Sequence, residues 1–202
     1  MNPTPQYNWP LLSQRVGADV WVKHENHTPT GAFKVRGGLI YVDELLQKSL
    51  DVVEFIAATR GNHGQSVACA VSQKNLKCKI VVPHGNSIEK NNAMSSQGGE
   101  LIVSGVDFQE SLEFAYELAD KKNMHFFPSF HPVLVKGVAT YAWELFSKIN
   151  DLDTVYVPIG MGSGVCGVIA ARDAMNLNTK VVGVVAENAP TYALSFKNRK
   201  TT

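Results

Sequence analysis

The sequence predicts an α/β fold with a mainly parallel sheet, and two observations favour it. Short runs rich in Val and Ile recur along the 202 residues, and helical patterns stand between them. Such strand–helix alternation is typical of parallel sheets covered by helices. Several of the runs are nearly continuous in Val and Ile, as expected for strands that are buried on both faces.

Six segments have the composition of β-strands. In chain order they are Asp19–Glu25, Val53–Thr59, Lys77–Pro83, Glu100–Ser104, Thr154–Pro158 and Lys180–Ala186. Six further segments have helical patterns. They are Lys34–Gln47, His63–Lys74, Ser87–Gln97, Asp107–Asn123, Val133–Ile149 and Ser163–Met175. The clearest is Asp107–Asn123, where apolar residues recur at steps of four, three and four and so share one helix face.

The composition indicates a soluble globular protein that is long enough to bury a core and to form two lobes, with 45% hydrophobic and 18% charged residues. Nineteen basic residues against eighteen acidic ones leave a net charge of +1, so we expect no nucleic-acid partner. No apolar run approaches the roughly 20 residues needed to cross a bilayer, so we expect no membrane partner.

The N-terminus and the cysteines predict a cytoplasmic protein. The opening MNPTPQYNWP lacks the basic and apolar stretches of a secretory signal. Cys69, Cys78 and Cys166 are odd in number and far apart, which predicts buried free thiols in a reducing compartment. Without CxxC spacing they do not indicate a metal site.

Ligands of such folds bind where strands lead into helices, and the first candidate loop is Thr30–Gly38, TGAFKVRGG. Gly31 brings the backbone close to whatever lies beside Lys34, and Gly37–Gly38 allows the following helix to pack tightly. Burial lowers the pKa of a lysine, and the neutral amine can attack an aldehyde to form a Schiff base. The alternative is a lysine that lies in solvent on the first turn of a helix.

The second loop is Thr59–Ser66, TRGNHGQS, directly after a predicted strand. Gly61 and Gly64 free the backbone, and the amides that open the next helix can bind a substrate carboxylate. Asn62 can hydrogen-bond to a phenolate oxygen, or it is an ordinary N-cap. From the residues alone, His63 is interpreted as structural.

The third loop is Pro158–Gly167, PIGMGSGVCG. Its glycine amides can converge on a phosphate, with the Ser163 hydroxyl adding a hydrogen bond. A GxGxG motif also suggests a dinucleotide, and Glu187 lies about where a ribose-binding acid would follow. This nicotinamide-binding alternative explains neither Lys34 nor Asn62. Together, the three loops suggest a phosphorylated aldehyde that is bonded covalently to the lysine, which is pyridoxal 5'-phosphate.

The motifs AFKVRGG and RGNHGQ, followed by a glycine-rich loop after an apolar strand, resemble the serine/threonine dehydratase and serine racemase family. These are fold-type II pyridoxal phosphate enzymes, with parallel sheets wrapped by helices in two lobes, similar to the β subunit of tryptophan synthase. The resemblance runs from about Asn8 to the end of the chain. It implies that Lys34 bonds to the cofactor, that Phe33 packs beside the ring, and that Asn62 contacts the ring 3-oxygen.

The resemblance also assigns the remaining site residues. The phosphate group would be held by Gly160, Met161, Gly162, Ser163 and Gly164. The substrate carboxylate would be surrounded by Thr59, Gly61, His63 and Gln65. The implied reaction is that of an ammonia-lyase. The Lys34 amine removes the α-proton of a serine- or threonine-like substrate, the β-hydroxyl leaves, and a 2-oxo acid and ammonia are released.

Family architecture implies a small α/β domain at residues 53–132, inserted into a large domain formed by residues 1–52 and 133–202. The family continues for about a hundred residues more, so we expect an incomplete large domain with an exposed sheet edge. We therefore expect either a homodimer or completion by a missing C-terminal segment. A catalytically inactive cofactor-binding or interaction module is the alternative from another class.

Two departures from the family bear on the activity. Arg60 stands where racemases have a serine that reprotonates the substrate, and a guanidinium is poorly suited to that role. It can instead pair with a second carboxylate, which makes 3-hydroxyaspartate a candidate substrate beside threonine and serine. Glu187 matches one acidic residue of the family's divalent-ion site, but Tyr192 and Ala193 stand near the second, so we predict no metal site. A racemase or a β-replacing synthase stays an alternative.

Overall fold

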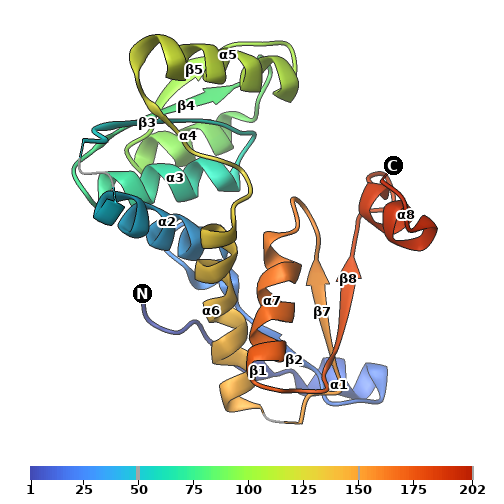
Figure 1. Ribbon diagram of the computed structural model, residues 1–202. Coiled ribbons are helices and arrows are strands. Elements are labelled where there is room, and N and C mark those ends of the chain that lie inside the picture. The colour runs from blue at the N-terminus through green and yellow to red at the C-terminus, as the bar shows by residue number, and fades with distance from the viewer. Residues whose placement is uncertain (49–50, 150, 202) are drawn as a thin grey trace.

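The computed structural model describes residues 1–48, 51–149 and 151–201, and it has the predicted α/β architecture (Figure 1). A four-stranded sheet has the order β5-β4-β3-β6, and all its strands are parallel. Its strands are β3 (Glu54–Ala58), β4 (Lys77–Val82), β5 (Glu100–Val103) and β6 (His125–Phe126). The connecting helices are α3 (Asn62–Ser72), α4 (Ile88–Ser96) and α5 (Phe108–Lys122).

The alternation of side chains along β3 explains why this sheet carries helices on both faces. Phe55 and Ala57 join a buried cluster that includes residues of α2 (Lys34–Lys48) and α3, whereas Ile56 and Ala58 pack with Ala115 and other residues of α5. Successive strand residues point to opposite faces, so a strand apolar at every position needs cover on both. The predicted burial on both faces is confirmed for β3 and for most of β4.

A second parallel sheet consists of β7 (Thr154–Pro158) and β8 (Lys180–Val184). It packs through Val157 and Val181 against α6 (Pro132–Lys148) and α7 (Ser163–Ala174). The other face is open, because Tyr156 is 71% exposed. The prediction of burial on both faces is therefore wrong for these two strands within the described chain.

The N-terminal residues form a small antiparallel pair, β1 (Gln6–Asn8) and β2 (Trp21–Lys23), around α1 (Pro10–Val16). A 3-10 helix, η1 (Glu25–His27), leads toward α2 (Lys34–Lys48), and α8 (Thr191–Asn198) follows β8. The predicted strand Asp19–Glu25 thus exists only in part, and it pairs antiparallel instead of joining a parallel sheet. Its partner β1 was not predicted, because three residues are too few for a sequence pattern.

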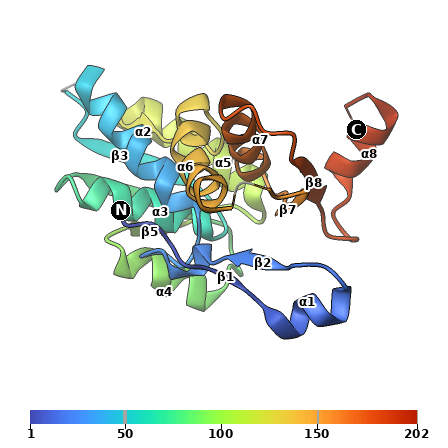
Figure 2. The same cartoon turned by 90° about the horizontal axis from the view of Figure 1, so that it is seen from below.

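Close helix packing around α2 depends on its two glycines, as predicted. A β-carbon at Gly37 would lie 2.8 Å from the Leu134 carbonyl oxygen of α6, and one at Gly38 would lie 3.0 Å from the Ser66 carbonyl oxygen of α3. Figure 2 shows α6 between α2 and α7. The glycines therefore let α2 approach the two elements that flank the candidate site.

Two further predictions can be compared with the structure. Cys69 and Cys78 are buried free thiols, as predicted, whereas Cys166 is only half-buried. None of the helices in the described part of the chain has the length and apolar character that a membrane crossing requires.

Candidate active site

One cavity is lined by residues from all three predicted loops. Its walls are Lys34, Gly37, His63, Ser66, Ser129, Leu134, Val138 and Ser163. Lys34 begins α2, His63 lies in the first turn of α3, and Ser163 begins α7. Three helix N-termini that are far apart in the sequence therefore meet at this cavity, each bringing its backbone amides and the positive end of its dipole.

Lys34 is half-buried, and burial lowers the pKa of its amine below the ordinary lysine value. Its ammonium nitrogen lies 5.5 Å from the centroid of the Phe33 ring. That ring packs in turn against the glycine-rich loop, because a β-carbon at Gly164 would lie 3.2 Å from its Cζ atom. The burial does not fit the alternative of a lysine in open solvent. It fits an amine that is available for covalent chemistry.

The loop before α3 is held by hydrogen bonding and by close packing. The buried Thr59 hydroxyl accepts a hydrogen bond from the Gly61 amide at 3.1 Å. Gly61 is the N-cap of α3, and Asn62 is the first helical residue with an exposed side chain that forms no cap. The ordinary N-cap alternative for Asn62 is therefore wrong. Gly64 has no room for a side chain, since a β-carbon there would collide with Met94.

Three other residues of this loop differ in exposure. Arg60 is exposed, Gln65 is half-buried, and His63 keeps part of its surface exposed. The Nε2 atom of His63 is nevertheless shielded from solvent and has no hydrogen-bond partner in the described parts of the chain. Burial and then the charge of Lys34 lower the pKa of His63 to about 4, although a hydrogen bond with the Phe127 backbone acts in the opposite direction.

The glycine-rich loop leads from β7 into α7. Gly162 is the N-cap of α7 with φ 94°, a left-handed conformation that favours glycine. Ser163 and Gly164 are buried, Met161 is 48% exposed, and a β-carbon at Gly160 would meet nothing within 4 Å. The loop thus has exposed backbone and unfilled space at Gly160.

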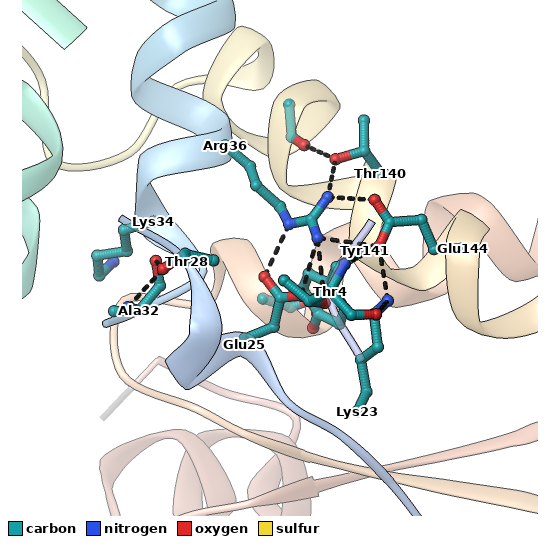
Figure 3. Close-up of polar contacts among 12 residues, drawn as sticks. Thr4, Lys23, Glu25, Thr28, Ala32, Lys34, Arg36, Thr140, Tyr141 and Glu144 are labelled. Carbon is teal, nitrogen blue, oxygen red and sulfur yellow. Dashed lines mark hydrogen bonds and ion pairs between the residues drawn. The ribbon is translucent and has the colours of Figure 1, made fainter. Parts of the chain in front are cut away.

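A buried ion-pair cluster lies on the far side of α2, and no sequence pattern predicts it. Arg36 is only 4% exposed and contacts Glu25 Oε2 at 2.7 Å and Glu144 Oε1 at 2.6 Å. Lys23 pairs with the same Glu144 at 2.6 Å. Figure 3 shows the Lys34 side chain pointing away from this cluster. The cluster therefore ties η1, β2 and α6 to the first turn of α2, the turn that carries Lys34.

Two observations test whether these residues fit pyridoxal phosphate. An aldehyde cofactor needs a primary amine with a lowered pKa, and a phosphate group needs converging amides at a helix N-terminus beside a loop without bulky side chains. Lys34 has such an amine, the loop at Gly160–Gly164 leads into the N-terminus of α7 with open space at Gly160, and Phe33 lies between Lys34 and this loop. The residues present therefore fit the cofactor.

Comparison with known proteins agrees with this fit. A family described as pyridoxal-phosphate dependent enzyme matches residues 1–202. The L-threonine dehydratase biosynthetic IlvA of Haemophilus influenzae is 35% identical over 189 residues, which cover 92% of this chain and 36% of that protein. The catabolic L-threonine dehydratase TdcB of Escherichia coli K12 is 29% identical over 201 residues, which cover 98% of this chain and 60% of that protein.

Solved structures give the same result for the fold. Threonine deaminase isoform 2 from Solanum lycopersicum superposes with a TM-score of 0.91 at 30% identity, covering 98% of this chain and 58% of that one. A pyridoxal 5'-phosphate-dependent aspartate racemase gives a TM-score of 0.92 at 26% identity, covering 98% and 61%. The chain thus spans less than two thirds of the length of each of these relatives.

Proposed function

The chain belongs to the pyridoxal-phosphate dependent enzyme family, and from this premise we propose that it is part of an ammonia-lyase for small hydroxy amino acids. The products are a 2-oxo acid and ammonia. The observation that carries the proposal is the meeting of Lys34, His63 and Ser163 at one cavity, in a chain that is 35% identical to a threonine dehydratase over 189 residues.

Lys34 is the proposed catalytic residue. When bound, pyridoxal phosphate supplies an electrophilic aldehyde and a ring that withdraws the electron pair left by a departing α-proton. Lys34 would hold the cofactor through its amine, and the same amine would take up the α-proton of the substrate. Burial suits this role, because it raises the fraction of neutral amine at physiological pH. Phe33 packs beside the cofactor ring and limits its movement.

The phosphate group is proposed to lie at the N-terminus of α7. The amides of Gly160, Met161, Gly162 and Gly164 would donate to it, and the Ser163 hydroxyl would add a donor. Tyr141 fixes this loop, because its hydroxyl donates to the Gly164 carbonyl at 3.3 Å. Asn62 would donate to the ring oxygen from the N-terminus of α3.

The substrate carboxylate is proposed to bind at the loop before α3, among Thr59, Gly61, His63 and Gln65. The α3 amides and helix dipole favour an anion there, and the hydrogen bond from Gly61 to Thr59 keeps the turn in shape. The exposed Arg60 guanidinium lies at the same loop and forms no ion pair within the described residues. It favours a second candidate substrate class, hydroxy amino acids with a distal carboxylate such as 3-hydroxyaspartate.

The domain organisation follows the same proposal. Residues 53–132, which contain the four-stranded sheet, form a small inserted domain, and residues 1–52 with 133–202 contribute to the large one. The open β7–β8 face is consistent with a dimer contact or with cover by a further segment. We place the protein in the cytoplasm, in keeping with its free thiols.

Product analysis tests the function. The purified protein is supplied with pyridoxal phosphate and with serine, threonine or 3-hydroxyaspartate, and both 2-oxo acid and ammonia are measured. We expect equal amounts of the two products from at least one substrate and none from a Lys34→Ala variant. An Arg60→Ser variant should lose turnover of 3-hydroxyaspartate selectively if Arg60 binds the distal carboxylate. Racemisation without ammonia release would contradict the lyase proposal.

A further inference from the structure

An unsatisfied nitrogen in the cavity wall points to a role for His63 that its interpretation as a structural residue does not cover. Buried polar atoms in folded proteins nearly always have a hydrogen-bond partner, and leaving one unpaired costs about 1–3 kcal/mol. The Nε2 atom of His63 is shielded from solvent and has no such partner in the part of the chain that the structure describes. His63 lines the cavity beside Lys34, so a ligand or a neighbouring donor in that cavity can satisfy this atom.

His63 also forms a hydrogen bond with the Phe127 backbone, and this bond determines which ring nitrogen carries the proton. A hydrogen bond that raises the pKa of a histidine is one that the imidazole donates, so the partner on Phe127 is its backbone carbonyl. Because Nε2 has no partner, the donor is Nδ1. The neutral ring therefore carries its proton on Nδ1, and Nε2 has a free lone pair that can only accept, so His63 borders the carboxylate site without donating to it.

Among the residues that line the cavity with His63, Lys34 carries the one ammonium group, and an ammonium has only donors. Both side chains line the same cavity, and the positive charge of Lys34 is felt at the imidazole. Burial lowers the pKa of Lys34, and none of the ion pairs among the described residues involves its ammonium. In the structure the amine lies over the Phe33 ring, 5.5 Å from its centroid, and the flexible four-carbon stem allows it to swing toward His63.

We propose that His63 is a positioning residue for Lys34, in which Nε2 accepts a hydrogen bond from the Lys34 amino group and holds that group inside the cavity. This inference rests on the proposed role of Lys34 as the reactive amine. No proton is transferred to the imidazole. The hydrogen bond fixes the direction of the amine between the Phe33 ring and the loop before α3, and it keeps the amine in place when it is not bonded to another group.

The test measures Lys34 in the cofactor-free protein. Acetic anhydride labels neutral amines, and peptide mass mapping gives the rate at Lys34 against pH, with the other lysines of the chain as internal references. The decisive variant is His63→Phe, which keeps an aromatic ring next to Phe127 but removes the acceptor. His63→Gln restores an acceptor oxygen at a similar distance. His125→Phe is the matched control, because His125 is a half-buried histidine that bonds to Tyr41 outside the cavity.

We expect Lys34 in His63→Phe to be acylated on the order of tenfold faster at pH 7, since a charge-assisted hydrogen bond no longer stabilises its ammonium. His63→Gln and His125→Phe should stay within about twofold of the unmodified protein, in keeping with an acceptor that is restored or never touched. An unchanged rate profile in a folded His63→Phe protein would overturn the inference.

A second measurement does not depend on a histidine variant being folded. The nitrogen NMR signal of His63 Nε2 should move when Lys34→Met removes the donor, and an unmoved signal also refutes the contact. Failure of the proposed function would give a result that can be told apart from failure of this inference. In that case pyridoxal phosphate forms no adduct with Lys34, whatever residue occupies position 63.

Discussion

Replacement of Arg36 tests whether the cluster behind α2 holds the Lys34 turn in place. Arg36 is 4% exposed and meets two carboxylates, Glu25 and Glu144, at 2.7 and 2.6 Å. An Arg36→Met variant fills a similar volume but leaves both carboxylates buried with only Lys23 to neutralise them. Breaking a buried ion pair by removing one partner costs about 3–5 kcal/mol. We expect a loss of this size in the free energy of unfolding.

The chain offers a matched control between the same two helices. Lys136 of α6 pairs with Glu44 of α2, but its side chain is 71% exposed. Exposed pairs are screened by water, so Lys136→Met should leave the unfolding free energy unchanged within error. Urea titrations at pH 7, followed by circular dichroism, measure both variants. If Arg36→Met loses no more than Lys136→Met, the cluster does not anchor α2 and the reasoning is refuted.

Three further predictions concern single residues of the site and its surroundings. The pKa of the half-buried Lys34 lies below its unfolded value of 10.5, so the burial of its ammonium destabilises the folded protein at pH values below this. Lys34→Met should therefore raise the thermal unfolding midpoint at pH 7 but not above pH 10.5. A lower midpoint at pH 7 would disprove the prediction. The pKa of His63 is lowered from 6.5 to about 4, so its contribution to the free energy of unfolding is full above pH 6.5 and falls by about 3 kcal/mol as the pH drops through 4. Urea titrations of His63→Phe should lack this loss at low pH. The same loss of stability in the variant and the unmodified protein would contradict the prediction. A β-carbon at Gly38 would collide with Ser66, whereas one at Gly160 would meet nothing within 4 Å. Gly38→Ala should therefore lower the free energy of unfolding by about 1–3 kcal/mol, and Gly160→Ala by much less. Equal losses of the two variants in chemical denaturation would show that close packing at Gly38 does not matter.

The parallel sheet and most helices could be predicted because their signals are local. The helix predicted at Asp107–Asn123 is α5, and these two residues are its caps. Asp107 accepts a hydrogen bond from the Glu110 amide, and Asn123 takes the left-handed conformation at the end. Short elements carried no such signal. The strands β1 and β6 have three and two residues, and their pairing depends on contacts with distant parts of the chain.

The candidate site was predictable in its loops but not in its supports. The rule that ligands bind at the carboxyl ends of strands led to Lys34 and to the loops that carry His63 and Ser163, which line one cavity. The contact between Arg36 and Glu144 joins residues 108 positions apart, and nothing in either segment indicates the other. The unpaired Nε2 of His63 could not be predicted from the sequence either, because the solvent access of one atom depends on the packed structure.

Covalent capture of the cofactor tests whether Lys34 is the residue that bonds to pyridoxal phosphate. The purified protein is mixed with pyridoxal phosphate and reduced with borohydride, and its peptides are mapped by mass spectrometry. We expect one phosphopyridoxyl group fixed at Lys34 and none in a folded Lys34→Ala variant. A folded protein that gives no adduct, or an adduct spread over exposed lysines and equal in both proteins, would contradict the assignment of Lys34 as the cofactor-binding residue.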